Sequence, residues 1–162
     1  MILAMAVSVL LVSLTILVHY EALRLTSLAM PRLTMMRPRL RIIFVIYGVF
    51  LAHTIEVYLY TIGYWLLVGY DPVHTGAALT HSSGGAMQEF TDLVYFSIVT
   101  YSTTGFGDLV PHGALRLIAG VESLNGLLLI GWSASFTYLW MERLWPLHGR
   151  RRAATAAPHR QG

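Results

Sequence analysis

The sequence contains no cysteine and no lysine, and it carries few charged residues of any kind. The absence of cysteine excludes disulfide bonds, thiol nucleophiles and thiolate metal sites. Charged residues make up 12% of the 162 residues, which is about half of the fraction that soluble domains carry. Apolar residues instead reach 56%, and they run in long blocks rather than in an amphipathic period. The composition therefore favours a membrane protein.

Three of these apolar blocks are long enough to cross a bilayer, which takes roughly 20 residues. We expect transmembrane helices at residues 1–19, 42–68 and 116–141. The first block resembles a signal peptide in length, but no basic residue precedes it, so we expect a retained helix. The remaining segments are a basic linker with a short interfacial helix (20–41), an outer loop (69–88) and a basic tail (142–162).

The arginines predict the orientation of these helices. Ten of the eleven arginines lie in residues 19–41 or in the tail, and only Arg116 lies elsewhere. The positive-inside rule therefore places both clusters in the cytoplasm and the N-terminus outside, in a plasma or inner membrane. Clusters beside apolar blocks suit anionic lipid headgroups and not nucleic acid. No apolar block has Arg at every third position, so a voltage sensor is not predicted.

The segment between the second and third blocks predicts the function. Residues 89–101 form a helix too short to span, and residues 103–108 read Thr-Thr-Gly-Phe-Gly-Asp. Irregular backbone at membrane depth is costly unless it is buried or faces water or ions. Gly105 and Gly107 adopt positive φ at little cost, whereas a β-branched Thr does not. Alternating backbone handedness would aim successive carbonyls to one side, so that four copies around an axis replace the hydration shell of a cation.

This segment resembles the filter of the potassium channel family, and the resemblance covers residues 42–141. The family filter is usually Thr-Val-Gly-Tyr-Gly followed by Asp. The resemblance implies a re-entrant pore helix (89–101), an inner helix (116–141) and an outer helix (42–68). It implies that K⁺ binds to the carbonyls of Thr103, Thr104, Gly105 and Phe106 and to the Thr103 hydroxyl. It also implies that three residues support the filter. The implied filter residues are Thr103, Thr104, Gly105, Phe106 and Gly107, supported by Asp108, Tyr95 and Phe96.

Three positions depart from the family pattern. Thr104 stands where Val is common, and Phe106 stands where Tyr is common. We expect Phe106 to pack against Phe96 as an aromatic pair without a hydrogen bond. Val99 stands where some members have Glu, so we expect the Tyr95 hydroxyl to hold Asp108. These departures bear on how strictly the pore selects potassium.

The inner helix carries further candidates. The resemblance places a gating hinge at Gly126, and close helix packing is the alternative. It also places Ile130, Ala134 and Tyr138 on an aqueous cavity. Glu122 is an intramembrane carboxylate, for which we favour a structural role through hydrogen bonds to the pore helix or the filter backbone.

Two further ionisable residues lie on the second apolar block. Glu56 and His53 are three residues apart and therefore neighbours on one helix face. We expect them to satisfy each other or another helix. A proton-sensing role is the alternative for these carboxylates and this histidine.

The fold class that follows is an all-α membrane protein, with three transmembrane helices, a re-entrant pore helix and a filter loop. One chain supplies one filter strand and shows no repeat, so we expect a homotetrameric channel. The predicted function is passive K⁺ conduction, with no enzyme activity and no cofactor besides the permeant ion. Two alternatives stay open: a weakly selective monovalent cation channel, and a non-conducting membrane accessory protein.

Overall fold

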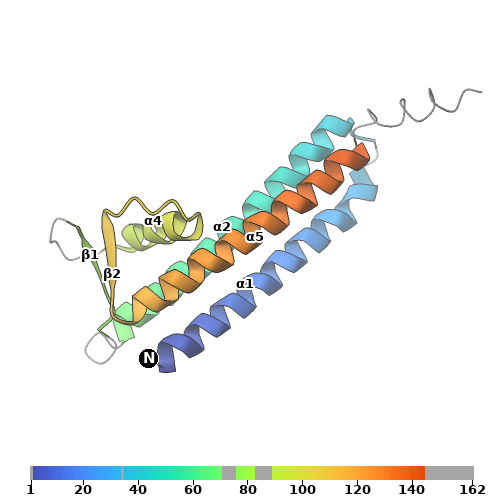
Figure 1. Cartoon of the computed structure of the whole chain (residues 1–162). Helices are drawn as coiled ribbons and strands as arrows, with labels where there is room; N and C mark the ends of the chain where they lie inside the picture. The colour runs from blue at the N-terminus through green and yellow to red at the C-terminus, as the bar shows by residue number, and fades with distance from the viewer. Residues whose placement is uncertain (1, 34, 71–75, 83–88, 145–162) are drawn as a thin grey trace, which may run out of the picture.

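The computed structural model describes residues 2–33, 35–70, 76–82 and 89–144. Within these residues the chain is mostly helical, with a two-stranded sheet beside the helices (Figure 1). In chain order the elements are α1 (Ile2–Ala29), η1 (Met30–Leu33), α2 (Pro38–Tyr70), β1 (Ala78–His81), α4 (Phe90–Tyr101), β2 (Leu109–His112) and α5 (Ala114–Leu144).

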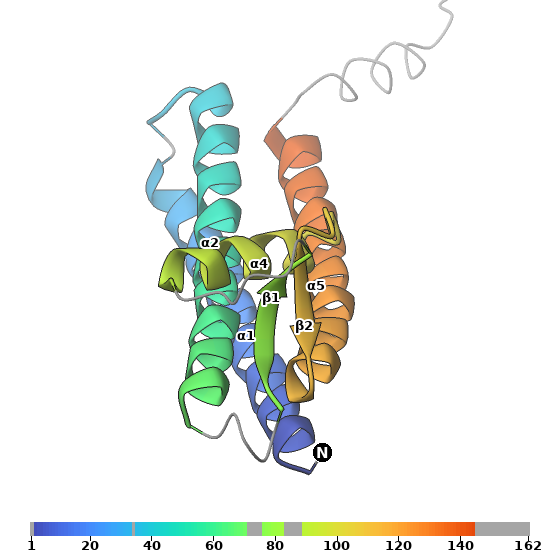
Figure 2. The ribbon, with the colours of Figure 1, turned by 90° about the vertical axis from the view of Figure 1, so that its left-hand side faces the viewer.

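Three long helices lie side by side and form the body of the molecule (Figures 1 and 2). Helix α1 packs against both α2 and α5, and α2 also packs against α5. By length and composition, the segments Ile2–Leu33, Pro38–Gly69 and Ala114–Leu144 can each cross a membrane. The prediction of three long apolar helices is therefore confirmed.

Helix α1 continues about ten residues beyond the predicted end at residue 19, to Ala29. No Gly or Pro interrupts residues 20–29, so nothing in this stretch stops the helix. His19, Leu23 and Thr26 are buried along it. The predicted linker at 20–41 is correspondingly too long, because α2 already begins at Pro38, where the fixed φ of proline suits a first helical position.

The short helix α4 and the sheet lie on one side of the three long helices (Figure 1). Helix α4 has Asp92 in its first turn, which favours the positive end of the helix dipole. The strands β1 and β2 are antiparallel, with Ala78 opposite His112 and His81 opposite Leu109. The sequence analysis did not predict these strands, because four-residue segments show too little alternation to be recognised.

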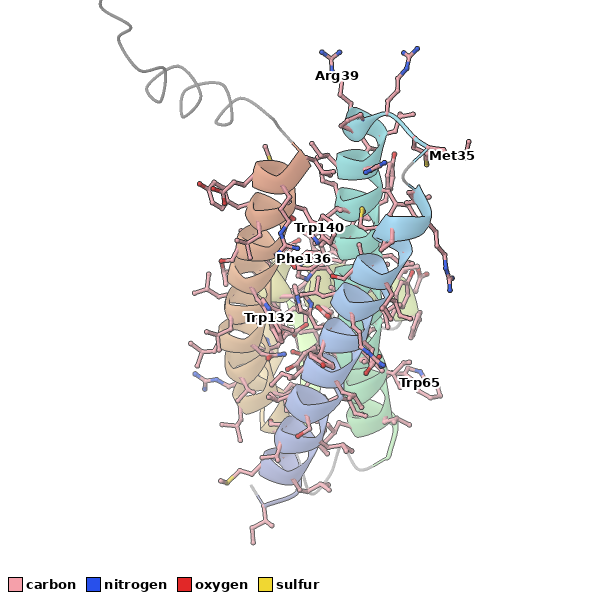
Figure 3. All side chains as sticks on the ribbon, turned by 90° about the vertical axis from the view of Figure 1, so that its right-hand side faces the viewer. Met35, Arg39, Trp65, Trp132, Phe136 and Trp140 are labelled. Atoms are coloured by element: carbon pink, nitrogen blue, oxygen red, sulfur yellow. The ribbon has the colours of Figure 1, made fainter. Side chains whose placement is uncertain are left out.

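Exposed apolar side chains cover much of the outside of the bundle, among them Leu17, Phe50 and Leu51. In water such a surface would be unfavourable, whereas lipid accommodates it. Figure 3 shows Met35 and Arg39 at one end of the bundle and Trp65 toward the other. Residues 145–162 of the predicted basic tail and residues 71–75 and 83–88 of the predicted outer loop lie outside the described residues.

Candidate functional site: the loop between α4 and β2

The backbone of the loop alternates in handedness at every second residue. Thr103, Gly105 and Gly107 have φ values of +58°, +52° and +78°. The glycines are where the sequence analysis expects positive φ, but Thr103 is a surprise because a left-handed L-residue costs roughly 1–2 kcal/mol. Two backbone hydrogen bonds hold the turn: Thr103 N donates to Thr100 O at 3.0 Å, and Gly105 N donates to Val99 O at 3.1 Å. The alternation therefore extends over three positions.

Every residue from Ser102 to Asp108 is exposed in the single chain. A Cβ atom added at Gly105 or Gly107 would meet no atom within 4 Å. The need for glycine at these two positions thus comes from the backbone conformation and not from crowding within the chain. The exposed side of the loop is therefore accessible to ions, water or other subunits.

Asp108, at the end of the loop, is held from two sides. On one side the Tyr95 hydroxyl of α4 faces the Asp108 carboxylate. Desolvation of Tyr95, hydrogen bonding to Asp108 and the negative charge of Asp108 raise the pKa of Tyr95. On the other side, Ser82 N donates to the backbone oxygen of Asp108 at 2.8 Å. The loop is therefore tied both to α4 and to the end of β1.

The predicted aromatic pair of Phe96 with Phe106 is wrong within the chain. Phe106 is 69% exposed, whereas Phe96 is 4% exposed. Phe96 instead packs edge-on against Tyr64 of α2, with ring centroids 5.3 Å apart. Phe96 lies on the face of α4 that packs against the long helices, so its side chain is already used there.

Glu122 of α5 lies fully buried behind α4. Ser97 Oγ of α4 donates to Glu122 Oε1 at 2.5 Å, and the Tyr64 hydroxyl of α2 donates to Oε2. Ser97 Oγ also lies 3.0 Å from the backbone oxygen of Val57. The carboxyl group of Glu122 therefore joins α2, α4 and α5, which fits the structural role that the sequence analysis favoured over proton sensing.

Gly126 of α5 lies directly against the end of α4. A Cβ atom built on Gly126 would lie 2.2 Å from the backbone oxygen of Tyr101. One turn before it, Ser123 Oγ donates to the backbone oxygen of Thr100 at 3.0 Å. This contact gives Gly126 a packing reason that is independent of any hinge, while the hinge stays a prediction.

Glu56 and His53 contact each other as the spacing predicts, with His53 Nδ1 3.1 Å from Glu56 Oε2. A second histidine, His19 of α1, lies with its Nδ1 2.8 Å from Glu56 Oε1. The sequence analysis missed His19 as a partner. In the sequence His19 is a single histidine at the end of an apolar block. That position does not indicate Glu56, 37 residues away, as its partner.

The predicted cavity residues do come together. Ile130, Ala134 and Tyr138 line one open groove of about 440 Å³ on α5 and α2, together with His53 and Met141. Tyr138 is 65% exposed and Ile130 is 38% exposed. The groove therefore lies between α2 and α5.

Comparisons with known proteins agree with this arrangement. A family model described as an ion channel matches residues 43–143. The chain is 44% identical over 50 residues to the two-pore potassium channel 1 of Arabidopsis thaliana, covering 30% of this chain and 14% of that protein. It is 39% identical over 70 residues to the two pore potassium channel b of Oryza sativa subsp. japonica, covering 41% of this chain and 20% of that protein. No solved structure matches.

The three apolar helices and the ion channel match define a membrane protein of the channel class. The family match covers more than half of the chain, and the chain belongs to the ion channel family. The two relatives above are named two-pore potassium channels. The chain spans about a seventh to a fifth of the length of these two relatives. Membership in an ion channel family indicates a transport protein.

Proposed function

We propose that the chain is one subunit of a homotetrameric potassium channel, with Thr103–Gly107 as its filter. The observation that carries the proposal is the alternation of positive φ at Thr103, Gly105 and Gly107 in a fully exposed loop. Alternating handedness aims successive carbonyls to one side, and rings of such oxygens replace the hydration shell of K⁺. The match to proteins named potassium channels favours this ion.

The position of the loop supports the same proposal. The loop follows the C-terminal end of α4, where the helix dipole places roughly half a negative charge. Exposed irregular backbone is not tolerated in lipid, so the loop must face a water-filled axis or neighbouring copies. In this arrangement α4 is re-entrant, the arginine-rich end near Arg39 is cytoplasmic, and Phe106 meets a neighbouring subunit.

Gly105→Ala tests the filter directly. Alanine at a φ of +52° is strained by roughly 1 kcal/mol or more, although no atom of the chain blocks its Cβ. We expect the purified oligomer to form and K⁺ uptake into liposomes to fall at least tenfold. Gly69→Ala is the matched control, because Gly69 lies at the end of α2 with no atom within 4 Å of an added Cβ. Equal K⁺ uptake by the two variants would overturn the filter assignment.

A weakly selective cation channel is the second candidate, and one observation favours it. Phe106 has no hydroxyl and is 69% exposed, so the chain itself does not brace this part of the loop. Reversal potentials with K⁺ on one side and Na⁺ on the other separate the two functions. A potential near the K⁺ equilibrium value supports the proposal, and one near zero supports weak selectivity.

A further inference from the structure

A buried cluster of polar side chains joins four helices below the loop. His19 comes from α1, His53 and Glu56 from α2, Tyr101 from the last position of α4, and Ser133 from α5. His19 and Glu56 are fully buried, and Ser133 is 4% exposed. Buried ionisable groups in an apolar bundle are costly unless each finds a partner. This cluster is therefore a built feature of the fold.

Three potential ligand atoms of the cluster lie close to one another. The Nδ1 atoms of His19 and His53 lie 2.8 Å and 3.1 Å from the two oxygens of the Glu56 carboxylate. One ligand atom from each of the three residues lies within 4.8 Å of the others. Donor atoms of a tetrahedral zinc ion with bonds near 2.0–2.1 Å lie roughly 3.3 Å apart. The two imidazole–carboxylate separations already lie within a few tenths of an ångström of this spacing, whereas a separation of up to 4.8 Å would have to shrink by up to about 1.5 Å to form such a shell.

The outer nitrogens of both imidazoles converge on one hydroxyl. Ser133 Oγ lies 3.2 Å from His19 Nε2 and 3.0 Å from His53 Nε2. A serine oxygen has two lone pairs but a single proton. Ser133 can therefore accept hydrogen bonds from both rings, but it can donate to only one of them. When both Nε2 atoms carry protons and donate to Ser133, both Nδ1 lone pairs point at Glu56. This is the tautomer that metal-ligating histidines adopt, with the outer N–H held by an acceptor.

The Tyr101 hydroxyl is a third hydrogen-bonding group at the Glu56 carboxylate. It donates to Glu56 and lies 2.8 Å from His53 Nδ1. Two neutral imidazoles and the hydroxyls of Ser133 and Tyr101 supply four protons to the cluster, and no buried polar atom of the described side chains lacks a hydrogen-bond partner. The partners of the Glu56 carboxylate are thus imidazoles and a hydroxyl, with no fixed cation such as an arginine among them. A cation between the Nδ1 atoms and the carboxylate would balance the negative charge of Glu56.

We infer that His19, His53 and Glu56 form a binding site for a transition-metal ion of the zinc type. Two imidazoles and a carboxylate are ligands that zinc accepts readily. A metal ion can bind the ligand atoms of all three residues at once, whereas a hydrogen-bonded proton lies between only two atoms. The Tyr101 hydroxyl donates to Glu56 and orients the carboxylate. His53 also lines the open groove beside Ser133, which gives an ion a route to the site.

The site fastens α1 to the region just before the loop. His19 is the α1 ligand, and Tyr101 directly precedes Ser102 at the start of the loop. The His53 and Tyr101 rings also pack edge-on, with centroids 5.7 Å apart. A bound metal would thus connect the peripheral helix to the end of α4. The link to conduction rests on the proposed function, whereas metal binding does not.

Zinc binding to the purified full chain tests the inference without any flux measurement. The protein is stripped with a chelator, equilibrated with Zn²⁺, desalted and assayed for zinc by atomic emission. We expect one zinc ion per chain for the wild type and loss of that zinc in H19Q/H53Q. The control H81Q/H112Q removes two exposed histidines of the strands and should bind as the wild type does. A zinc-free wild type, or undiminished zinc in H19Q/H53Q, overturns the inference.

A second variant covers the case in which H19Q/H53Q does not fold. Ser133→Ala leaves all three ligands in place and removes the acceptor of both outer N–H groups. Loss of such a partner lowers metal affinity roughly 10–100-fold, measured as the Zn²⁺ concentration at half-saturation. Unchanged affinity contradicts the inferred site. A wild type that binds no zinc but takes up one proton in this cluster would assign the positive charge beside Glu56 to a proton and reject the metal.

Discussion

Substituting Gly126 with alanine tests the closest contact between α5 and the end of α4. The new Cβ would lie 2.2 Å from Tyr101 O and 3.1 Å from Tyr101 Cγ. Moving the Cβ and the carbonyl from 2.2 Å to an ordinary contact of 3.4 Å requires a displacement of about 1.2 Å. The carbonyl belongs to the backbone, so no side-chain rotation relieves the overlap. The displacement must move α5 or the residue that precedes the loop.

Two opposing effects set the change in stability caused by Gly126→Ala. Overpacking in a close-packed region costs about 1–3 kcal/mol, and alanine regains about 1 kcal/mol of helix propensity over glycine. The folded protein should therefore lose at most about 2 kcal/mol of stability. If the strain is borne at the filter entrance, about 1–3 kcal/mol of barrier corresponds to a reduction in K⁺ flux between about fivefold and about 150-fold.

The assay compares three alanine variants of the same helix. Gly126→Ala, Gly120→Ala and Gly131→Ala are each reconstituted, and K⁺ uptake and the midpoint of thermal oligomer loss are measured. Added Cβ atoms at Gly120 and Gly131 meet nothing within 4 Å, so these variants should conduct normally and be equally or more stable. Wild-type flux and stability in Gly126→Ala would refute the contact. Equal losses in all three would indicate a general need for flexibility in α5 instead.

Two further predictions concern the polar groups around the loop. Glu122→Leu should destabilise the protein by about 1–3 kcal/mol, because the buried Tyr64 hydroxyl loses its acceptor. The control is Glu142→Leu, which changes an exposed glutamate. Equal thermal midpoints of the two variants would contradict the structural role of Glu122. Tyr95→Phe removes the hydrogen bond to Asp108, so we expect Na⁺ uptake relative to K⁺ to rise. Because the pKa of Tyr95 is raised in the fold, the stabilising effect of Tyr95 is present below about pH 10 and declines above it. The difference in thermal midpoint between wild type and Tyr95→Phe should therefore narrow only at alkaline pH.

Local sequence patterns predicted the elements that a few neighbouring residues determine. The apolar blocks gave three long helices, because length and hydropathy alone decide whether a segment suits a membrane. The spacing of Glu56 and His53 predicted that they contact each other, because residues three apart share a helix face. The glycines at 105 and 107 gave two left-handed positions, because only glycine adopts that conformation freely.

The partners of the buried polar groups were beyond such patterns. Glu122 bonds to Tyr64, 58 positions away, and Asn125 Nδ2 donates to Thr15 Oγ1, 110 positions away. Nothing in the sequence near either residue names its partner, because helix packing brings the two together. The left-handed φ of Thr103 is similar, since two hydrogen bonds to α4 offset a conformation that its own side chain disfavours.

The sequence by itself determined that the chain enters a membrane and that its loop alternates glycine with larger residues, since both are local properties of composition and order. Only the tertiary structure decided what stands behind that loop. It set Gly126 against the Tyr101 carbonyl and gathered two histidines, a glutamate and a serine from three helices into one ring. Contacts between distant segments depend on how the helices pack, and packing is a property of the whole fold.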